Sequence, residues 1–323
     1  MKNLRVQSTL GAKVDGVIHR IIAKVFPTNT FTIHEVQQGH MTLVYKIVLD
    51  TGKVYYFRAS NSREKSFEVL SSIHSELLQL GAKIPKVYTN GSRSTLFPMD
   101  WMIVAEIMGR PFRSYLGEMT RKQREEILSE LFETMKAFWK YTCKGFGHGN
   151  KKSLGEFGPV APYATNYDFL LSNFELHMHK ICSQMHASND IIKILDKLSI
   201  YKRYLKQDVS VFCHGDLSDK HIMVENGKFT GVIDLDEFRC SSIFYDFAYL
   251  YSYLQNSDRE FVISLYHKFI PHERFVREKL LITNVLIAVN DIAYMMDDLH
   301  LDVTNHQHVL SIQENLPEVL SFE

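Results

Sequence analysis

Residues Val211–Leu250 read VFCHGDLSDKHIMVENGKFTGVIDLDEFRCSSIFYDFAYL. Short apolar segments alternate here with polar ones, which predicts buried strands joined by loops that carry functional side chains. Acidic and imidazole groups gather in those loops, as in a catalytic or metal site: His214, Asp216, His221, Asp234, Asp236 and Asp246.

A β-hairpin is predicted at the centre of this stretch. Ile222–Val224 forms the first strand, Asn226-Gly227 is a strong signal for a tight turn, and Phe229–Ile233 forms the returning strand. Asp216 precedes the first strand and Asp234 follows the second. Because antiparallel pairing brings these ends together, both carboxylates should lie at one end of the hairpin, where a divalent cation would relieve their repulsion.

The segments HGDLSDKH, VIDLDEF and YDFAYL resemble the catalytic region of the aminoglycoside phosphotransferase and choline kinase family, whose fold is that of the protein kinases. The resemblance implies that Asp216 is the catalytic base and that His214 belongs to the catalytic loop. It implies that Asp234 is the main magnesium ligand and that Asp246 braces the loop. His221 stands where the family has a metal-binding asparagine.

His221 leaves two interpretations open. A neutral imidazole can bind a metal or contact a phosphate in place of the asparagine. Magnesium prefers oxygen ligands, so His221 could instead contact only substrate or water.

Composition excludes several classes of protein. The chain has 323 residues with 45% hydrophobic and 23% charged residues, typical of a globular protein of one large or two modest domains. The formal net charge is zero, so neither nucleic acid nor an anionic membrane is an expected partner. Four scattered cysteines, no export signal and no apolar run near the roughly 20 residues of a membrane span predict a cytoplasmic protein.

The first hundred residues predict an amphipathic helix over 14–25 and a small antiparallel sheet. Three strands are predicted within FTIHEV, TLVYKIVL and VYYFRAS, and two more within IPKVYTNG and DWMIVA. By resemblance, Gly39 and His40 form a flap over the nucleotide phosphates, although an ordinary hairpin turn fits the same residues. Arg58 would contact those phosphates.

The family pattern implies three further residues at the nucleotide site. Glu68, on the amphipathic helix after the third strand, would pair with Arg58, although a solvated face explains a helical glutamate equally well. Glu106 and Ile107 resemble the hinge that binds a nucleotide base through main-chain groups. Magnesium and ATP or GTP are the expected cofactors.

The rest of the chain is predicted to be mainly helical. Thr120 and Gln123 form a capping box, two helices are expected over about 166–186 and 189–206, and EKLLITNVLIAVNDIAYMMDDLHLD reads as a buried helix. The predicted fold class is therefore α+β: a bilobal, kinase-like fold with a nucleotide-binding lobe over residues 1–108 and a helical catalytic and substrate-binding lobe over 109–323.

Acidic residues near the C-terminus suggest a cationic substrate. In aminoglycoside kinases such residues bind ammonium groups, so the resemblance implies this role for Asp291, Asp297 and Asp298, although solvated helix-end carboxylates are the alternative. Two histidine pairs, His177/His179 and His306/His308, are interpreted as surface residues because cysteine ligands are scarce and, at the first pair, a two-residue spacing on a helix points the rings to different faces.

The predicted function is transfer of the γ-phosphate of ATP or GTP to a hydroxyl of an aminoglycoside or related aminocyclitol. A kinase for choline, homoserine or a sugar is an alternative within the same chemistry. A non-catalytic nucleotide-binding protein with a kinase fold is the alternative from another class, and it is disfavoured because both Asp216 and Asp234 are present. The sequence contains no G-x-S-x-G motif, so a hydrolase is not predicted.

Overall fold

The computed structural model divides the chain into two compact units. The first takes in the described residues up to Leu78 together with Ile84–Ile107, and the second takes in Gln79–Lys83, Met108–Asn150 and Leu154–Glu323. An antiparallel sheet in the first and a mainly helical second unit confirm the predicted α+β fold class. The residues that the structure describes are 16–36, 42–62, 66–95, 97–150, 154–155, 158–185, 189–206, 208–297 and 299–323.

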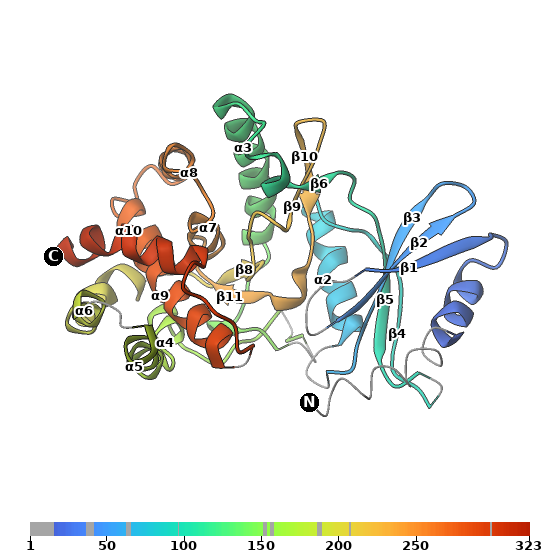
Figure 1. The fold of residues 1–323 in the computed structure, drawn as a ribbon, viewed down its shortest axis with the longest axis horizontal. Coiled ribbons are helices and arrows are strands. Elements are labelled where there is room, and N and C mark those ends of the chain that lie inside the picture. The colour runs from blue at the N-terminus through green and yellow to red at the C-terminus, as the bar shows by residue number, and fades with distance from the viewer. Residues whose placement is uncertain are drawn as a thin grey trace. The chain divides into compact units, whose positions relative to one another are not determined.

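The first unit is built on a five-stranded antiparallel sheet with the order β1-β2-β3-β5-β4 (Figure 1). Its strands are β1 (Phe31–Glu35), β2 (Leu43–Leu49), β3 (Val54–Ser60), β4 (Val87–Gly91) and β5 (Asp100–Ala105). Ile47, Phe57 and Ile103 belong to the buried cluster that also contains Ile18 and Ile22 of the helix over residues 16–25. The apolar side of the predicted amphipathic helix therefore packs against the sheet in one hydrophobic core.

Helix α2 (Phe67–Gln79) follows the third strand. Leu70, Ile73 and Leu77 are buried along one side, as their three- and four-residue spacing predicts. The chain leaves the helix at Gly81, whose φ of +92° is the left-handed conformation that favours glycine at a helix end.

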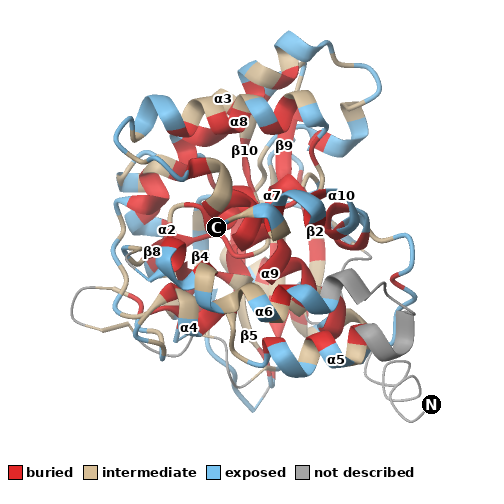
Figure 2. Ribbon diagram, turned by 90° about the vertical axis from the view of Figure 1, so that its left-hand side faces the viewer, coloured by how far each residue is buried: buried red, intermediate tan, exposed pale blue. Residues whose placement is uncertain are grey.

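The second unit is mainly helical, and α9 is its most buried long helix (Figure 2). The capping box predicted at the start of α3 is present, with Thr120 and Gln123 bonding each other's main chain. The helices are α3 (Arg121–Trp139), α4 (Asn166–Leu170), α5 (Phe174–Met185), α6 (Asn189–Leu205), α7 (Tyr245–Tyr251), α8 (Asn256–Phe269), α9 (Val276–Asp297) and α10 (Gln307–Ser321).

Two sequence-based expectations for these helices were wrong. The helix expected over 166–186 is broken into α4 and α5, and Asn173 between them has a φ of +63°, which no α-helix accommodates. No apolar run near the length of a membrane span was expected. Among the described residues, however, one helix, α9, is long enough and apolar enough to cross a membrane by length and composition alone. In the structure, 67% of its apolar 18-residue window is buried. Packing against α7 and α10 accounts for its apolar composition.

Two small sheets support the catalytic stretch within the second unit. One has the order β10-β9-β6 and the other β7-β11-β8. Their strands are β6 (Arg110–Pro111), β7 (Gly147–His148), β8 (Val211–Cys213), β9 (Ile222–Glu225), β10 (Lys228–Val232) and β11 (Arg239–Ser241). The hairpin predicted from Asn226-Gly227 is confirmed, since both residues have positive φ and β9 pairs antiparallel with β10.

Gly109 allows β6 to approach β9. Its φ is +107°, and a Cβ at this position would lie 2.1 Å from the carbonyl oxygen of Val224. We expect Gly109→Ala to lower the free energy of unfolding by about 1–3 kcal/mol, the usual cost of a strained backbone conformation. Urea unfolding would measure this. Gly117→Ala is the matched control, because nothing lies within 4 Å of its Cβ position. Equal effects of the two substitutions would contradict the interpretation.

Candidate active site

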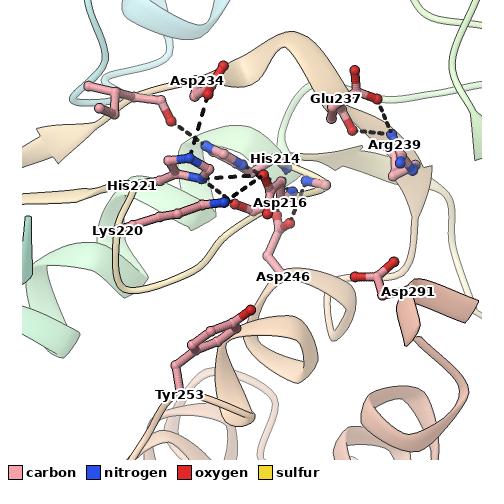
Figure 3. A network of polar contacts seen from close by, with 12 residues as sticks. His214, Asp216, Lys220, His221, Asp234, Glu237, Arg239, Asp246, Tyr253 and Asp291 are labelled. Carbon is pink, nitrogen blue, oxygen red and sulfur yellow. Dashed lines mark hydrogen bonds and ion pairs between the residues drawn. The ribbon is translucent and has the colours of Figure 1, made fainter. Parts of the chain in front are cut away.

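Asp246 holds the loop that follows β8. It is fully buried at the start of α7, and its carboxylate accepts hydrogen bonds from the main-chain N–H groups of His214 (2.8 Å) and Gly215 (3.0 Å) (Figure 3). Burial raises the pKa of Asp246, whereas the hydrogen bonds from the two N–H groups favour its charged form. The predicted brace is therefore in place geometrically.

The loop can take this course only with glycine after His214. Gly215 has a φ of +88°, and a Cβ there would lie 2.0 Å from the carbonyl oxygen of Glu237. The close approach of the Glu237 backbone and the positive φ thus explain why the second residue of the HGD sequence is glycine.

His214 is buried beneath the loop as a neutral ring. Its Nε2 lies 2.8 Å from the carbonyl oxygen of Ile233 and must donate, while its Nδ1 accepts the N–H of Asp216 at 3.3 Å. Burial, and then the neighbouring His221, lower the pKa of His214. His214 therefore holds Asp216 in position by accepting a hydrogen bond from its main-chain N–H.

Asp216 presents a partly exposed carboxylate, 26% accessible, at the surface of the loop. Lys220 Nζ lies 3.7 Å from its Oδ2, and His221 Nδ1 lies at the same distance. A partly exposed carboxylate on a rigid loop can accept a proton from a substrate hydroxyl.

His221 stands between the two carboxylates that the hairpin was predicted to bring together. Its Nδ1 lies 2.7 Å from the main-chain oxygen of Asp216, which can only accept, so Nδ1 carries the proton. The opposite nitrogen, Nε2, then presents a lone pair 3.5 Å from Oδ2 of Asp234. Two electron-rich atoms facing each other at this distance fit a cation bound beside them.

Asp234 itself has an uncommon backbone conformation. Its φ of +70° places it in the left-handed region, where non-glycine residues cluster at functional sites. In the part of the chain that is described, no group of three or more His, Cys, Asp or Glu side chains could hold a metal ion. A cation at His221 and Asp234 would therefore complete its coordination with phosphate oxygens and water, as magnesium usually does.

The nucleotide residues predicted from the family pattern lie in the first unit. Arg58 is in the middle of β3, paired with Val44 and Met102, and Glu68 is exposed in the first turn of α2. Their pairing stays a prediction. Gly39 and His40 lie outside the described residues.

The expected hinge follows β5. The Glu106 side chain lies 3.3 Å from the Tyr56 hydroxyl and 3.4 Å from Lys46 Nζ, and its N–H donates to Val54. Burial, followed by the Glu106 carboxylate, raises the pKa of Tyr56 to about 12. Ile107 is half-buried at the end of the unit.

The three acidic residues proposed for a cationic substrate have different environments. Asp291 lies on α9 with its carboxylate facing His308 Nε2 at 3.4 Å. Asp297 forms an ion pair with Lys180 of α5. Asp298 lies outside the described residues.

Other residues near the catalytic loop were missed by sequence reasoning. Tyr249 hydrogen-bonds the Asp216 carboxylate, and Tyr253 hydrogen-bonds Tyr249. Tyr249 lies three residues after Asp246 on α7, a helical spacing that could have identified it, whereas Tyr253 lies beyond the end of α7 at Tyr251. His308, interpreted as a surface residue, is 1% exposed because it packs beneath Tyr249 and Tyr253.

Comparisons with known proteins agree with this geometry. The model of the phosphotransferase enzyme family matches residues 32–278. No curated protein sequence matches the chain.

Solved structures show the same fold at low identity. A thermostable mutant of aminoglycoside phosphotransferase APH(4)-Ia, in complex with ADP and hygromycin B, has a TM-score of 0.66 and 15% identity, covering 93% of this chain and 97% of that one. The GDP and kanamycin complex of APH(2")-IIIa has a TM-score of 0.61 and 16% identity, covering 94% and 97%. From the extent of the family match, this chain belongs to the phosphotransferase enzyme family.

Proposed function

We propose that this protein transfers the γ-phosphate of ATP or GTP to a hydroxyl group of a small cationic substrate, an aminoglycoside or a related aminocyclitol. Asp216 orients the acceptor hydroxyl and takes its proton as the bond to phosphorus forms. Asp246 and His214 keep the Asp216 main chain fixed while this happens.

The arrangement of Asp216, His221 and Asp234 carries the proposal. A base carboxylate and a second carboxylate lie on either side of one imidazole, at 3.7 Å and 3.5 Å from its two nitrogens. A phosphoryl transferase needs an aligned hydroxyl and a cation that neutralises the phosphate oxygens. Asp216 supplies the carboxylate for the first task, and Asp234 supplies a ligand for the cation of the second.

Magnesium fits the residues present, with Asp234 as its oxygen ligand and His221 as a nitrogen ligand. When bound, such an ion neutralises charge on the nucleotide phosphates. We assign the nucleotide contacts in the first unit to Arg58, Glu106 and Ile107 by the family pattern. The structures of related fold that contain ADP or GDP support a nucleotide donor.

Nucleotide consumption would test the function directly. We would screen aminoglycosides, aminocyclitols, choline, homoserine and sugars with both ATP and GTP, and identify the product by mass spectrometry. The proposal expects consumption that depends on an aminoglycoside or aminocyclitol and gains one phosphate on that compound. Consumption that depends on none of these acceptors would contradict it.

His221 should set the metal preference of the site. An imidazole nitrogen suits Mn²⁺ better than Mg²⁺. We expect His221→Asn to weaken Mn²⁺ binding in the presence of a non-hydrolysable nucleotide roughly tenfold, and to leave Mg²⁺ binding less affected. Electron paramagnetic resonance of free Mn²⁺, with Mg²⁺ as competitor, would measure both. An unchanged Mn²⁺ affinity would show that His221 does not bind the ion.

A further inference from the structure

A chain of hydrogen bonds runs from the interior of the second unit to the catalytic loop. It begins between α9 and α10 and ends at the carboxylate of Asp216. We call it the interior chain, and its members in order are Asn284, Ser252, His308, Tyr253 and Tyr249. The first three members are at most 2% exposed, so their polar groups depend on one another for hydrogen bonds.

The first member of the chain has a fixed orientation. Nδ2 of Asn284 donates to the carbonyl oxygen of Ala248 and to Ser252 Oγ, both at 2.8 Å. Its Oδ1 accepts from Ser311 (2.9 Å) and Asn315 (3.2 Å). Because a carbonyl oxygen can only accept, the amide cannot be reversed. Ser252 therefore accepts a hydrogen bond from Asn284 and can donate its own hydroxyl hydrogen.

His308 continues the chain in the same direction. Its Nδ1 lies 3.0 Å from Ser252 Oγ and accepts the hydroxyl hydrogen of that serine. Its Nε2 lies 3.4 Å from both the Tyr253 hydroxyl and Oδ2 of Asp291. An ionised carboxylate can only accept, so Nε2 carries a proton, and the Tyr253 oxygen also lies within reach of it. The ring packs edge-on against both tyrosines, with its centroid 5.1 Å from that of Tyr249 and 5.5 Å from that of Tyr253.

The two tyrosines make the last hydrogen bonds before the base. Their rings lie 19° from parallel, with centroids 6.2 Å apart. The Tyr249 hydroxyl hydrogen-bonds the Asp216 carboxylate, and the Tyr253 hydroxyl hydrogen-bonds Tyr249. Burial raises the pKa of both phenols, so each keeps the one hydrogen that it can donate. Because an ionised carboxylate only accepts, Tyr249 donates to Asp216, and Tyr253 donates to Tyr249.

The cationic neighbours of this carboxylate lie beyond hydrogen-bond distance. Lys220 Nζ and His221 Nδ1 are each 3.7 Å from Asp216 Oδ2 (Figure 3). His221 instead donates from Nδ1 to the main-chain oxygen of Asp216, and the Lys220 side chain is 45% exposed. Of these three neighbours, Tyr249 is the one that hydrogen-bonds the carboxylate, and it does so from a buried position on α7.

We propose that Tyr249 is a positioning residue of the base Asp216, and that the interior chain holds its hydroxyl hydrogen toward the carboxylate. This inference rests on the proposed function. A hydrogen bond to one carboxylate oxygen restricts rotation of the side chain and leaves the other oxygen for the acceptor hydroxyl. Each member of the chain both accepts and donates, and hydrogen bonds aligned in this way strengthen one another.

Removal of one hydroxyl group isolates this effect. Tyr249→Phe keeps the ring and should lower kcat about 10- to 100-fold, the usual value of a hydrogen bond to a charged group expressed as a rate. The KM for nucleotide should stay unchanged, because no contact of the bound nucleotide is removed. Tyr201→Phe is the matched control: Tyr201 is 1% exposed on α6 and donates to the carbonyl oxygen of Val319. It should leave kcat unchanged.

The order of the chain provides a second test. Tyr253→Phe leaves the Tyr249 hydroxyl without its donor and should lower kcat less than Tyr249→Phe does. In the double variant the second substitution should add nothing, because the chain is already broken at its last link. His308→Phe should lower kcat as Tyr253→Phe does, whereas His308→Gln, whose amide can accept and donate, should restore most of it. The thermal unfolding transition of each variant checks its fold.

The hydrogen bonds can also be followed without catalysis. In the full-length protein labelled with ¹³C at tyrosine Cζ, the Phe variants assign the NMR signals of Tyr249, Tyr253 and Tyr201. Asp216→Ala should shift the Tyr249 signal most, shift the Tyr253 signal less, and leave the Tyr201 signal in place. His308→Phe should shift the signals of Tyr253 and Tyr249.

Three results would overturn the proposal. These are a Tyr249→Phe enzyme with the kcat of Tyr201→Phe, a multiplied loss of kcat in the double variant, and an unchanged Tyr249 signal in Asp216→Ala. The proposed function is judged separately by the nucleotide-consumption screen. A kinase that tolerates Tyr249→Phe contradicts only the positioning role. A Tyr249 signal that responds to Asp216→Ala in a protein without phosphoryl transfer contradicts only the kinase function.

Discussion

Asp216→Asn is expected to lower kcat by about 100- to 10,000-fold, the usual contribution of a general base. An amide cannot accept the proton of the attacking hydroxyl, but it keeps the size of the side chain and its contact with Tyr249. The nucleotide and metal residues are unchanged, so the affinity for nucleotide should stay close to that of the wild-type protein. The rate is measured with the best acceptor from the screen, or as slow nucleotide hydrolysis.

The comparison needs a control for changes in charge. Asp196→Asn removes one negative charge from an exposed position on α6 and should leave kcat unchanged. An Asp216→Asn enzyme with more than a tenth of the wild-type kcat would show that the carboxylate is not the base. A loss of nucleotide binding in parallel with the rate would instead indicate a structural role.

The fold could be predicted where local signals and the chain's long-range pairing agree. Asn226-Gly227 fixes the β9–β10 hairpin because both residues take positive φ, and Thr120 with Gln123 fixes the start of α3. The break at Asn173 could not be predicted, because an asparagine in a helical pattern gives little warning of a left-handed conformation. The apolar length of α9 is explained by its neighbours, which only the tertiary structure identifies.

The site could be predicted where its residues are close in sequence. Asp216, Asp234 and Asp246 belong to one motif, and the hairpin between the first two is local. His308 and Asp291 are brought together by the packing of α9 against α10, and no periodicity predicts that contact. A buried histidine held by a serine hydroxyl looks, in sequence, like any exposed one.

The catalytic loop should depend strongly on Asp246 for its stability. Asp246→Ala leaves the buried N–H groups of His214 and Gly215 without an acceptor, and each such group costs about 1–3 kcal/mol. Removing the carboxylate also removes the cost of burying its charge, which is seen in its raised pKa. Because two donors are orphaned together, the first effect should exceed the second. We expect the free energy of unfolding to fall by about 2–5 kcal/mol.

Urea unfolding followed by circular dichroism would measure this loss, with Asp196→Ala as the exposed control expected to change stability by less than about 0.5 kcal/mol. Asp246→Asn keeps one acceptor oxygen but directs an amide group at the second N–H, so its effect should not be smaller than the loss of one bond. If Asp246→Ala were as stable as the control, water would have to satisfy both N–H groups. The space left by the removed carboxylate is about the size of one water molecule, which can accept both hydrogen bonds. A shift of the loop around that water would appear as a loss of kcat in a protein of normal stability.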